Sequence, residues 1–242
     1  MFSNLTTNQQ SKTGDFVRYN LWDRGYFVLR TIVIALLTIS LAIAVPLLWR
    51  SFYYMHISLL HLDEVTPWTA DEIREAYDRM MDFCLWDREF STGVLKWSEE
   101  GMQHFADCSK LFHFDTHILI VSVMLTAGLY AVKRVGAIRE MHPKGHGPLF
   151  WGGLIPIVLI ILIGLAVVFV DFDKAFVVFH QLFFPGKTNW LFNPETDEII
   201  LVLPEVFFRN CAILIAVIIV LFGSLMMYLD ICNNNRASAN NF

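Results

Sequence analysis

The sequence predicts an all-α integral membrane protein, with four transmembrane helices, a small extracytoplasmic helical cap and an aromatic re-entrant or interfacial loop. Hydrophobic residues make up 55% of the 242 residues and charged residues only 17%, which is more apolar than an ordinary soluble domain. The apolar residues are gathered in blocks, and a helix needs about 20 such residues to cross a bilayer. Basic and acidic residues alternate between the segments that separate these blocks.

Four apolar blocks account for the membrane spans. We expect spans at residues 31–49, 116–132, 148–170 and 211–229. The second block is short, so we expect it to be tilted or to include Phe112 and Phe114. The first is expected to be a retained anchor, because its apolar run continues to Trp49 without the small-residue site of a cleaved signal peptide. We expect the four spans to form a single membrane domain over residues 1–242.

The distribution of lysine and arginine predicts the orientation of the spans. Basic residues gather in the N-terminal tail, which includes Lys12 and Arg18, and in the 133–147 loop, whereas the 51–115 and 171–205 loops are acidic. Short segments rich in lysine and arginine stay in the cytoplasm. We therefore expect a multi-pass protein of the cell membrane with both termini cytoplasmic and the two acidic outer loops at the extracytoplasmic face.

The first outer loop is predicted to form the helical cap. Thr69 is suited to cap a helix that carries Glu72 in its first turn, and apolar residues then recur at helical spacing to about Cys84. Ser98, followed by two glutamates, is suited to cap a second helix that runs to roughly Lys110.

The second of these helices carries a histidine and an acid on one face. His104 and Asp107 are three residues apart, a spacing that places both side chains together. A carboxylate there can accept the proton of one ring nitrogen and leave the other as a base. The alternative is a surface histidine with an incidental acidic neighbour.

The second outer loop combines an aromatic face with one histidine. Its phenylalanines suit the membrane interface, where aromatic rings anchor: Phe172, Phe176, Phe179, Phe183 and Phe184. His180 lies among them, and Pro204 with Glu205 is suited to start the last helix. If the two outer loops meet, they form an apolar pocket with His104 and His180 as its polar groups.

Other motifs do not support a cofactor. Gly186-Lys187-Thr188 resembles the end of a phosphate-binding loop but lacks the leading glycine and the strand, so we expect neither a nucleotide nor a nucleic acid as partner. His113 and His117 have a zinc-compatible spacing without a nearby third ligand, and we expect no metal. Cys84 and Cys108 share an outer loop and can pair there, although unpaired structural cysteines are the simpler interpretation.

Two blocks of the sequence resemble a known family. They are WSEEGMQHFADCSKLF at 97–112 and FHQLFFPGKTNWLFNPETDEIILVLPEVFF at 179–208. Both resemble the bacterial four-span integral membrane family that includes the lipoprotein intramolecular transacylase. The resemblance implies that His104 and His180 are catalytic. Within these blocks we assign supporting roles to Asp107, Trp190 and Glu205. The first block reads HFADC where the family leads us to expect H-M-x-D-V, so Cys108 is a departure that leaves the histidine and the aspartate in place.

The resemblance also implies a reaction. The sn-2 acyl chain of a diacylglyceryl-cysteine lipoprotein moves to the α-amino group of that cysteine and gives the lyso form. The expected partners are the lipid-modified N-terminus and bilayer lipid. The amine is the nucleophile, and with a pKa of about 8 it needs a base, which a histidine with a pKa near 6.5 can provide. The alternatives are a metal-dependent membrane hydrolase and a non-enzymatic membrane partner protein.

Overall fold

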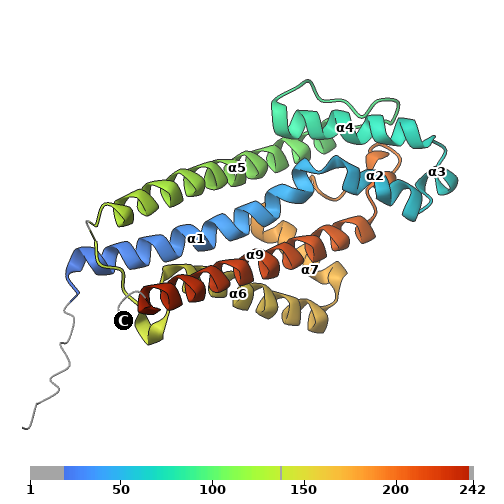
Figure 1. Ribbon diagram of the computed structural model, residues 1–242. Coiled ribbons are helices and arrows are strands. Elements are labelled where there is room, and N and C mark those ends of the chain that lie inside the picture. The colour runs from blue at the N-terminus through green and yellow to red at the C-terminus, as the bar shows by residue number, and fades with distance from the viewer. Residues whose placement is uncertain (1–18, 137, 240–242) are drawn as a thin grey trace, which may run out of the picture.

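The computed structural model describes residues 19–136 and 138–239, and within them the fold is all-helical (Figure 1). The basic residues Lys12 and Arg18 lie outside the described residues. Among the described residues, four helices are long and apolar enough to cross a membrane, which confirms the predicted fold class. They are α1 (Leu21–Leu48), α5 (Glu99–Arg134), α6 (Pro148–Val170) and α9 (Glu205–Ala239).

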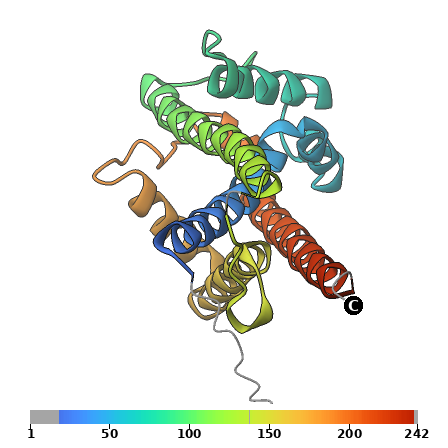
Figure 2. The ribbon, with the colours of Figure 1, turned by 60° about the vertical axis from the view of Figure 1, so that its left-hand side comes forward.

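The four long helices form one bundle in which α1 contacts each of the other three, and α6 also packs on α9 (Figure 2). Successive helices run in opposite directions, so the start of α1, the end of α9 and the loop between α5 and α6 share one end of the bundle (Figure 1). The short helices gather at the opposite end, which we call the cap end.

Glycines allow the close approach of α6 to its neighbours. A Cβ atom on Gly153 would lie 2.4 Å from the carbonyl oxygen of Gly223 in α9, and one on Gly152 would lie 2.7 Å from Ile34 of α1. Small residues at helix contacts let backbones approach closely, and this close packing helps to hold membrane helices together. Ion pairs join the helices at the end where α1 begins and α9 ends, where Glu140 pairs with Arg30 of α1 and Lys133 of α5.

The cap consists of α2 (Arg50–Leu59), α3 (Leu62–Val65) and α4 (Ala70–Trp86), with α8 (Ile199–Val202) packed against it. Thr69 and Glu72 form the predicted start of α4 as a reciprocal capping box. The rings of Tyr53 and Tyr77 stack with centroids 3.8 Å apart. The Tyr53 hydroxyl donates to the carbonyl of Val202 at 2.7 Å. The two outer loops are therefore packed together.

One predicted boundary is wrong. The second cap helix, expected to end near Lys110, and the second span, expected at 116–132, are one continuous helix of 36 residues, α5. Hydropathy marks only the part of a helix that lies in hydrocarbon, and no proline or glycine interrupts the backbone between these segments. At 1.5 Å per residue the helix is about 54 Å long, well beyond the hydrocarbon thickness of about 30 Å. Its first turns therefore form part of the cap end.

The first and last long helices also extend beyond the apolar blocks that predicted them. α1 begins ten residues before the predicted span, at Leu21, where Asn20 caps it. α9 begins at Glu205, as predicted, and continues past residue 229. The aromatic segment is a helix, α7 (Phe172–Phe183), which follows α6 after a single residue, Asp171.

Candidate active site

His104 lies near the start of α5. The Ser98 hydroxyl caps this helix by accepting from the amide of Gly101 at 3.0 Å, which orients the first turns. The imidazole is only 5% exposed. It lies between the rings of Phe184 and Phe192, at centroid distances of 5.0 and 5.4 Å. An aromatic enclosure therefore surrounds this ring.

His180 lies in the last turn of α7 and is 6% exposed. Its Nδ1 is 2.8 Å from the carbonyl of Phe176, an acceptor, so Nδ1 carries the proton in the neutral ring and Nε2 is left as an acceptor. Trp190 stacks on the imidazole at 4.7 Å. Burial lowers the pKa of His180, a change opposed by the hydrogen bond to Phe176. The ring is therefore neutral at pH 7 and is available as a base.

The two histidines lie side by side. Their ring centroids are 5.7 Å apart and their planes differ by 33°. One comes from α5 and the other from α7, 76 residues later in the chain. The structure thus brings together the two residues that the sequence analysis singled out from separate loops.

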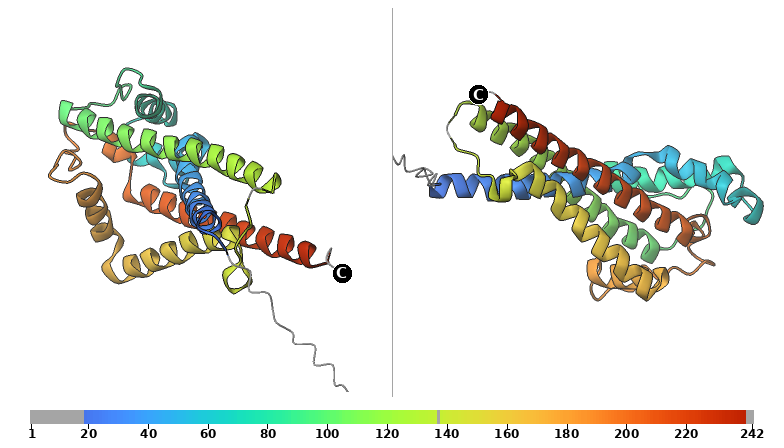
Figure 3. Two further views of the ribbon diagram at one scale, coloured as in Figure 1. Left: turned by 90° about the vertical axis from the view of Figure 1, so that its left-hand side faces the viewer. Right: turned by 60° about the horizontal axis from the view of Figure 1, so that its bottom comes forward.

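The loop after α7, residues 184–198, leads from the end of α7 towards the start of α5 (Figure 3, left), and we call it the strap. Its rings contact both histidines: Phe184 and Phe192 contact His104, and Trp190 contacts His180. Its far end is attached to the start of α5, because Asp197 accepts from the amide and the hydroxyl of Ser98, each at 2.8 Å. The approach is close: a Cβ atom on Gly101 would lie 2.1 Å from Asp197 and 3.1 Å from Phe192. Only glycine at position 101 lets the strap pack this tightly.

Asp107 does not orient His104, and the predicted hydrogen bond between them is wrong. Its carboxylate pairs with Lys110 at 3.0 Å and with Lys187 of the strap, and it accepts from Asn189 at 3.4 Å. The Nδ1 atom of His104 has no hydrogen-bond partner in the described part of the chain. The three-residue spacing brings the Asp107 carboxylate near the His104 ring, but the carboxylate points towards the strap. Asp107 therefore attaches the middle of the strap to α5.

The two other supporting residues have different positions. Trp190 lies in the strap against His180, and its indole N–H donates to the carbonyl of Lys187 at 3.0 Å. Glu205 is the first residue of α9 and interacts with Asp173 and Arg209. Among the described residues, Glu205 forms no hydrogen bond or ion pair with either histidine. Trp190 belongs to the site by geometry, whereas Glu205 interacts with the first turn of α7, at the other end of that helix from His180.

Cys84 and Cys108 are both free, in agreement with the simpler interpretation of the sequence, and the alternative of a disulfide between them is excluded. Cys84 is fully buried, and its thiol faces the carbonyl of Phe105 at 3.6 Å. Cys108 is partly exposed, and its Sγ lies 3.5 Å from Nε2 of His104. The contact of Cys108 with His104 is a finding of the structure that was not predicted from the sequence, although the four-residue spacing on one helix indicates it.

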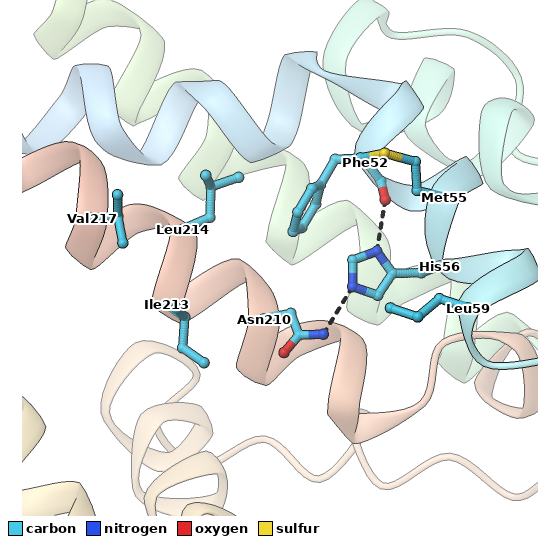
Figure 4. A pocket seen from close by; sticks show the side chains of 8 residues that line it. All are labelled: Phe52, Met55, His56, Leu59, Asn210, Ile213, Leu214 and Val217. Atoms are coloured by element: carbon cyan, nitrogen blue, oxygen red, sulfur yellow. Dashed lines mark hydrogen bonds between the residues drawn. The ribbon is translucent and has the colours of Figure 1, made fainter.

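Two further features lie outside the histidine pair. His113 contacts the carbonyl of Leu85 at 3.2 Å, and no group of three or more potential metal ligands occurs among the described residues. A hollow of about 570 Å³ lies between α2 and α9 (Figure 4). At its edge His56 contacts the carbonyl of Phe52 at 2.7 Å and the amide of Asn210 at 2.9 Å. Both ring nitrogens of His56 are thereby used within the fold.

Comparison with known proteins gives structural relatives. A solved structure of the membrane integral lipoprotein intramolecular transacylase Lit from Bacillus cereus matches with a TM-score of 0.78 and 26% identity, over 90% of this chain and 98% of that one. A variant of that protein, with a histidine replaced by alanine, matches with a TM-score of 0.75 and 26% identity, over 90% and 96%.

A sequence relative is more distant. An uncharacterized protein of Aquifex aeolicus strain VF5 is 23% identical over 140 residues, which are 57% of this chain and 58% of that protein. The chain therefore spans little more than half the length of this relative. The family model of the lipoprotein intramolecular transacylase Lit matches residues 28–208, a segment that contains both histidines, the cap and the strap. The protein belongs to the Lit family of lipoprotein intramolecular transacylases.

Proposed function

We propose that this protein moves the sn-2 acyl chain of a diacylglyceryl-cysteine lipoprotein to the α-amino group of the same cysteine. The observation that carries the proposal is the contact of His104 with His180 inside an aromatic enclosure. The family membership supports transacylation in general, and the solved relatives are lipoprotein intramolecular transacylases. That the donor is the sn-2 ester and the acceptor is the α-amino group of the cysteine is part of the proposal and goes beyond the family membership.

The environments of the two rings support a division of labour. His180 donates from Nδ1 to Phe176, so its Nε2 is suited to take the proton of the attacking amine. His104 has a buried Nδ1 without a partner in the described residues, and an N–H there is suited to stabilise the negative charge on the ester oxygen. The amine forms the C–N bond, the ester C–O bond breaks, and the glyceryl oxygen leaves with a proton.

The enclosure favours transfer to the amine over hydrolysis. Rings of Phe184, Phe192 and Trp190 line the histidines, and both imidazoles are almost fully buried. Exclusion of water from a site suppresses hydrolysis as a side reaction. Amine and ester belong to one substrate, so holding both in this enclosure provides much of the rate through proximity.

We also propose that the cap end faces the extracytoplasmic side. Basic residues gather at the end of α5 (Lys133 and Arg134) and in the following loop (Arg139). That end of the bundle is opposite to the cap and to the start of α5, which carries His104 (Figure 1). Basic segments of this kind stay in the cytoplasm. The histidine pair would then meet lipoproteins at the outer face of the membrane.

The test uses purified full-length protein in liposomes with a synthetic diacylglyceryl-cysteine peptide. Intramolecular transfer leaves the mass of the peptide unchanged, so the position of the chain is read by fragmentation and by resistance of the new amide to mild alkali. A mixture of deuterated and unlabelled substrates gives no mixed products. Loss of one acyl chain from the peptide would instead indicate a hydrolase, and exchange of labelled chains would indicate an intermolecular transferase.

A further inference from the structure

The strap carries a buried hydrogen-bond acceptor that has no donor. Asn189 directly precedes Trp190, whose ring stacks on His180 at 4.7 Å. The Nδ2 atom of Asn189 donates to the carboxylate of Asp107 at 3.4 Å. Its Oδ1 atom is buried and has no hydrogen-bond partner within residues 19–136 and 138–239. Buried polar groups in folded proteins are normally paired, so this acceptor indicates a donor that the substrate brings.

The Asp107 carboxylate fixes which way the amide of Asn189 faces. Burial acts to raise the pKa of Asp107, but hydrogen bonds from Lys187, Lys110 and Asn189 lower it to about 2, so the carboxylate is ionised at neutral pH. An ionised carboxylate only accepts hydrogen bonds. The NH₂ group of Asn189 therefore faces Asp107, and Oδ1 is directed away from that carboxylate.

We propose that Asn189 binds the α-amino group of the lipid-modified cysteine, with Oδ1 accepting a hydrogen bond from it. This assignment rests on the proposed function and names the residue that holds the nucleophile. The ester and thioether groups of the substrate only accept hydrogen bonds, so its donors are the α-amino group and the amides of the peptide. The α-amino group must reach Nε2 of His180, and Trp190, the residue next to Asn189, stacks on that ring.

The two unpartnered atoms near the histidine pair are complementary to the two reacting groups. An N–H at Nδ1 of His104 suits the ester oxygen, whereas Oδ1 of Asn189 suits the amine. A neutral primary amine has two hydrogens. Asn189 holds one of them, and the other passes as a proton to Nε2 of His180 as the C–N bond forms. A neutral amide suits this task, because a carboxylate would stabilise the ammonium form, which has no lone pair for the attack.

The experiment lets two substrates compete in one sample. Full-length protein in liposomes receives equal amounts of the diacylglyceryl-cysteine peptide and of its Nα-methyl analogue, which has one N–H fewer. Fragmentation mass spectrometry gives the ratio of the two N-acylated products. Wild type should favour the free amine, because the methylated amine leaves Oδ1 unpaired. In Asn189→Ala this ratio should fall by about tenfold, as expected for a lost hydrogen bond to a buried group.

The matched control is Asn193→Ala. Asn193 lies in the same strap, but its Oδ1 already accepts from the amide of Glu195 at 3.0 Å. A loosened strap lowers the conversion of both substrates and leaves their ratio unchanged, so Asn193→Ala should keep the wild-type ratio. Asn189→Ser, whose hydroxyl can still donate to Asp107, should give the same lowered ratio as Asn189→Ala and takes its place if the alanine variant does not insert.

Three results would overturn the inference. A wild-type ratio in the Asn189 variants would show that Oδ1 does not hold the amine, and an equal fall in Asn193→Ala would show that the ratio depends on the strap as a whole. If a substrate with an ester in place of its first peptide amide is discriminated by wild type but not by Asn189→Ala, the acceptor binds the peptide instead. Absence of N-acylated peptide from wild type with the free amine would contradict the proposed function itself, and this inference with it.

Discussion

The two nitrogens of the His180 ring have different tasks, and this difference has a measurable pH dependence. The pKa of His180 is lowered from 6.5, chiefly by burial. The neutral ring is the base, so the limb of the wild-type pH–rate profile that His180 sets should lie below pH 6.5. In Trp190→Ala, water reaches the imidazole, its pKa moves back towards 6.5, and the acidic limb of the pH–rate profile should move to higher pH.

The ammonium group of the substrate is common to both proteins, so its titration cancels in the comparison. An acidic limb at the same pH in Trp190→Ala and wild type would show that burial under the indole does not set the His180 pKa. The lowered pKa of His180 also affects the free energy of unfolding. Because the folded-state pKa lies below the unfolded one, His180 contributes stability above pH 6.5 that is lost as the pH falls.

Asp107 acts through the strap and not through the imidazole, which changes the variants that test it. If its partner is Lys187, Asp107→Asn and Lys187→Gln should lower conversion by similar factors. We expect about tenfold, since a displacement of about 1 Å in a site can cost about 10²-fold. The double variant should be little worse than either single one, as residues of one pair are not additive.

The comparison is made as initial rates of lyso-form production at equal amounts of inserted protein. Multiplicative losses in the double variant would mean that the two residues act independently. Lys110→Gln is the matched control, because Lys110 pairs with the same carboxylate from its own helix, three residues away, and not from the strap.

At the scale of elements, the attachment of the strap to α5 depends on one glycine. Gly101→Ala would place a Cβ atom 2.1 Å from the Asp197 carboxylate, which is buried and held by Ser98. We expect loss of conversion by about tenfold or more, with the protein still inserted. Gly128→Ala, on the same helix with nothing within 4 Å of the new Cβ, should retain activity. Equal rates in the two variants would contradict tight packing of the strap.

The sequence predicted the elements better than their connections. The spans, the start of α4 at Thr69 and the start of α9 at Glu205 follow from hydropathy and capping, which are local properties. The union of the cap helix with the second span was missed because polarity changes at the membrane surface while the backbone stays helical. His104 and His180 were found as unusual polar groups in apolar surroundings. The pairing of Asp107 with Lys187 could not be predicted, because the two residues are 80 positions apart in the sequence and only the fold brings them together.

For the whole molecule, the proposed orientation predicts which loops are accessible from outside the cell. In a chain whose four cysteines are replaced, Glu195→Cys in the exposed part of the strap should react with a membrane-impermeant thiol reagent added to intact cells. Pro143→Cys, in the loop between α5 and α6, should react only after the membrane is permeabilised. The reverse pattern would place the histidine pair at the cytoplasmic face and exclude extracytoplasmic lipoprotein as the substrate.

The bundle as a whole holds the two histidines in contact, and their joint action is the central claim. The most direct test is the yield of lyso-form peptide, located by fragmentation, for His104→Ala, His180→Ala and the double variant at equal protein abundance. Loss of a catalytic acid or base costs about 10²- to 10⁴-fold, so each single variant should lose almost all conversion. The double variant should be little worse than either single one, since residues that act as a unit are not additive. Substantial lyso-form from His180→Ala at normal abundance would contradict the account.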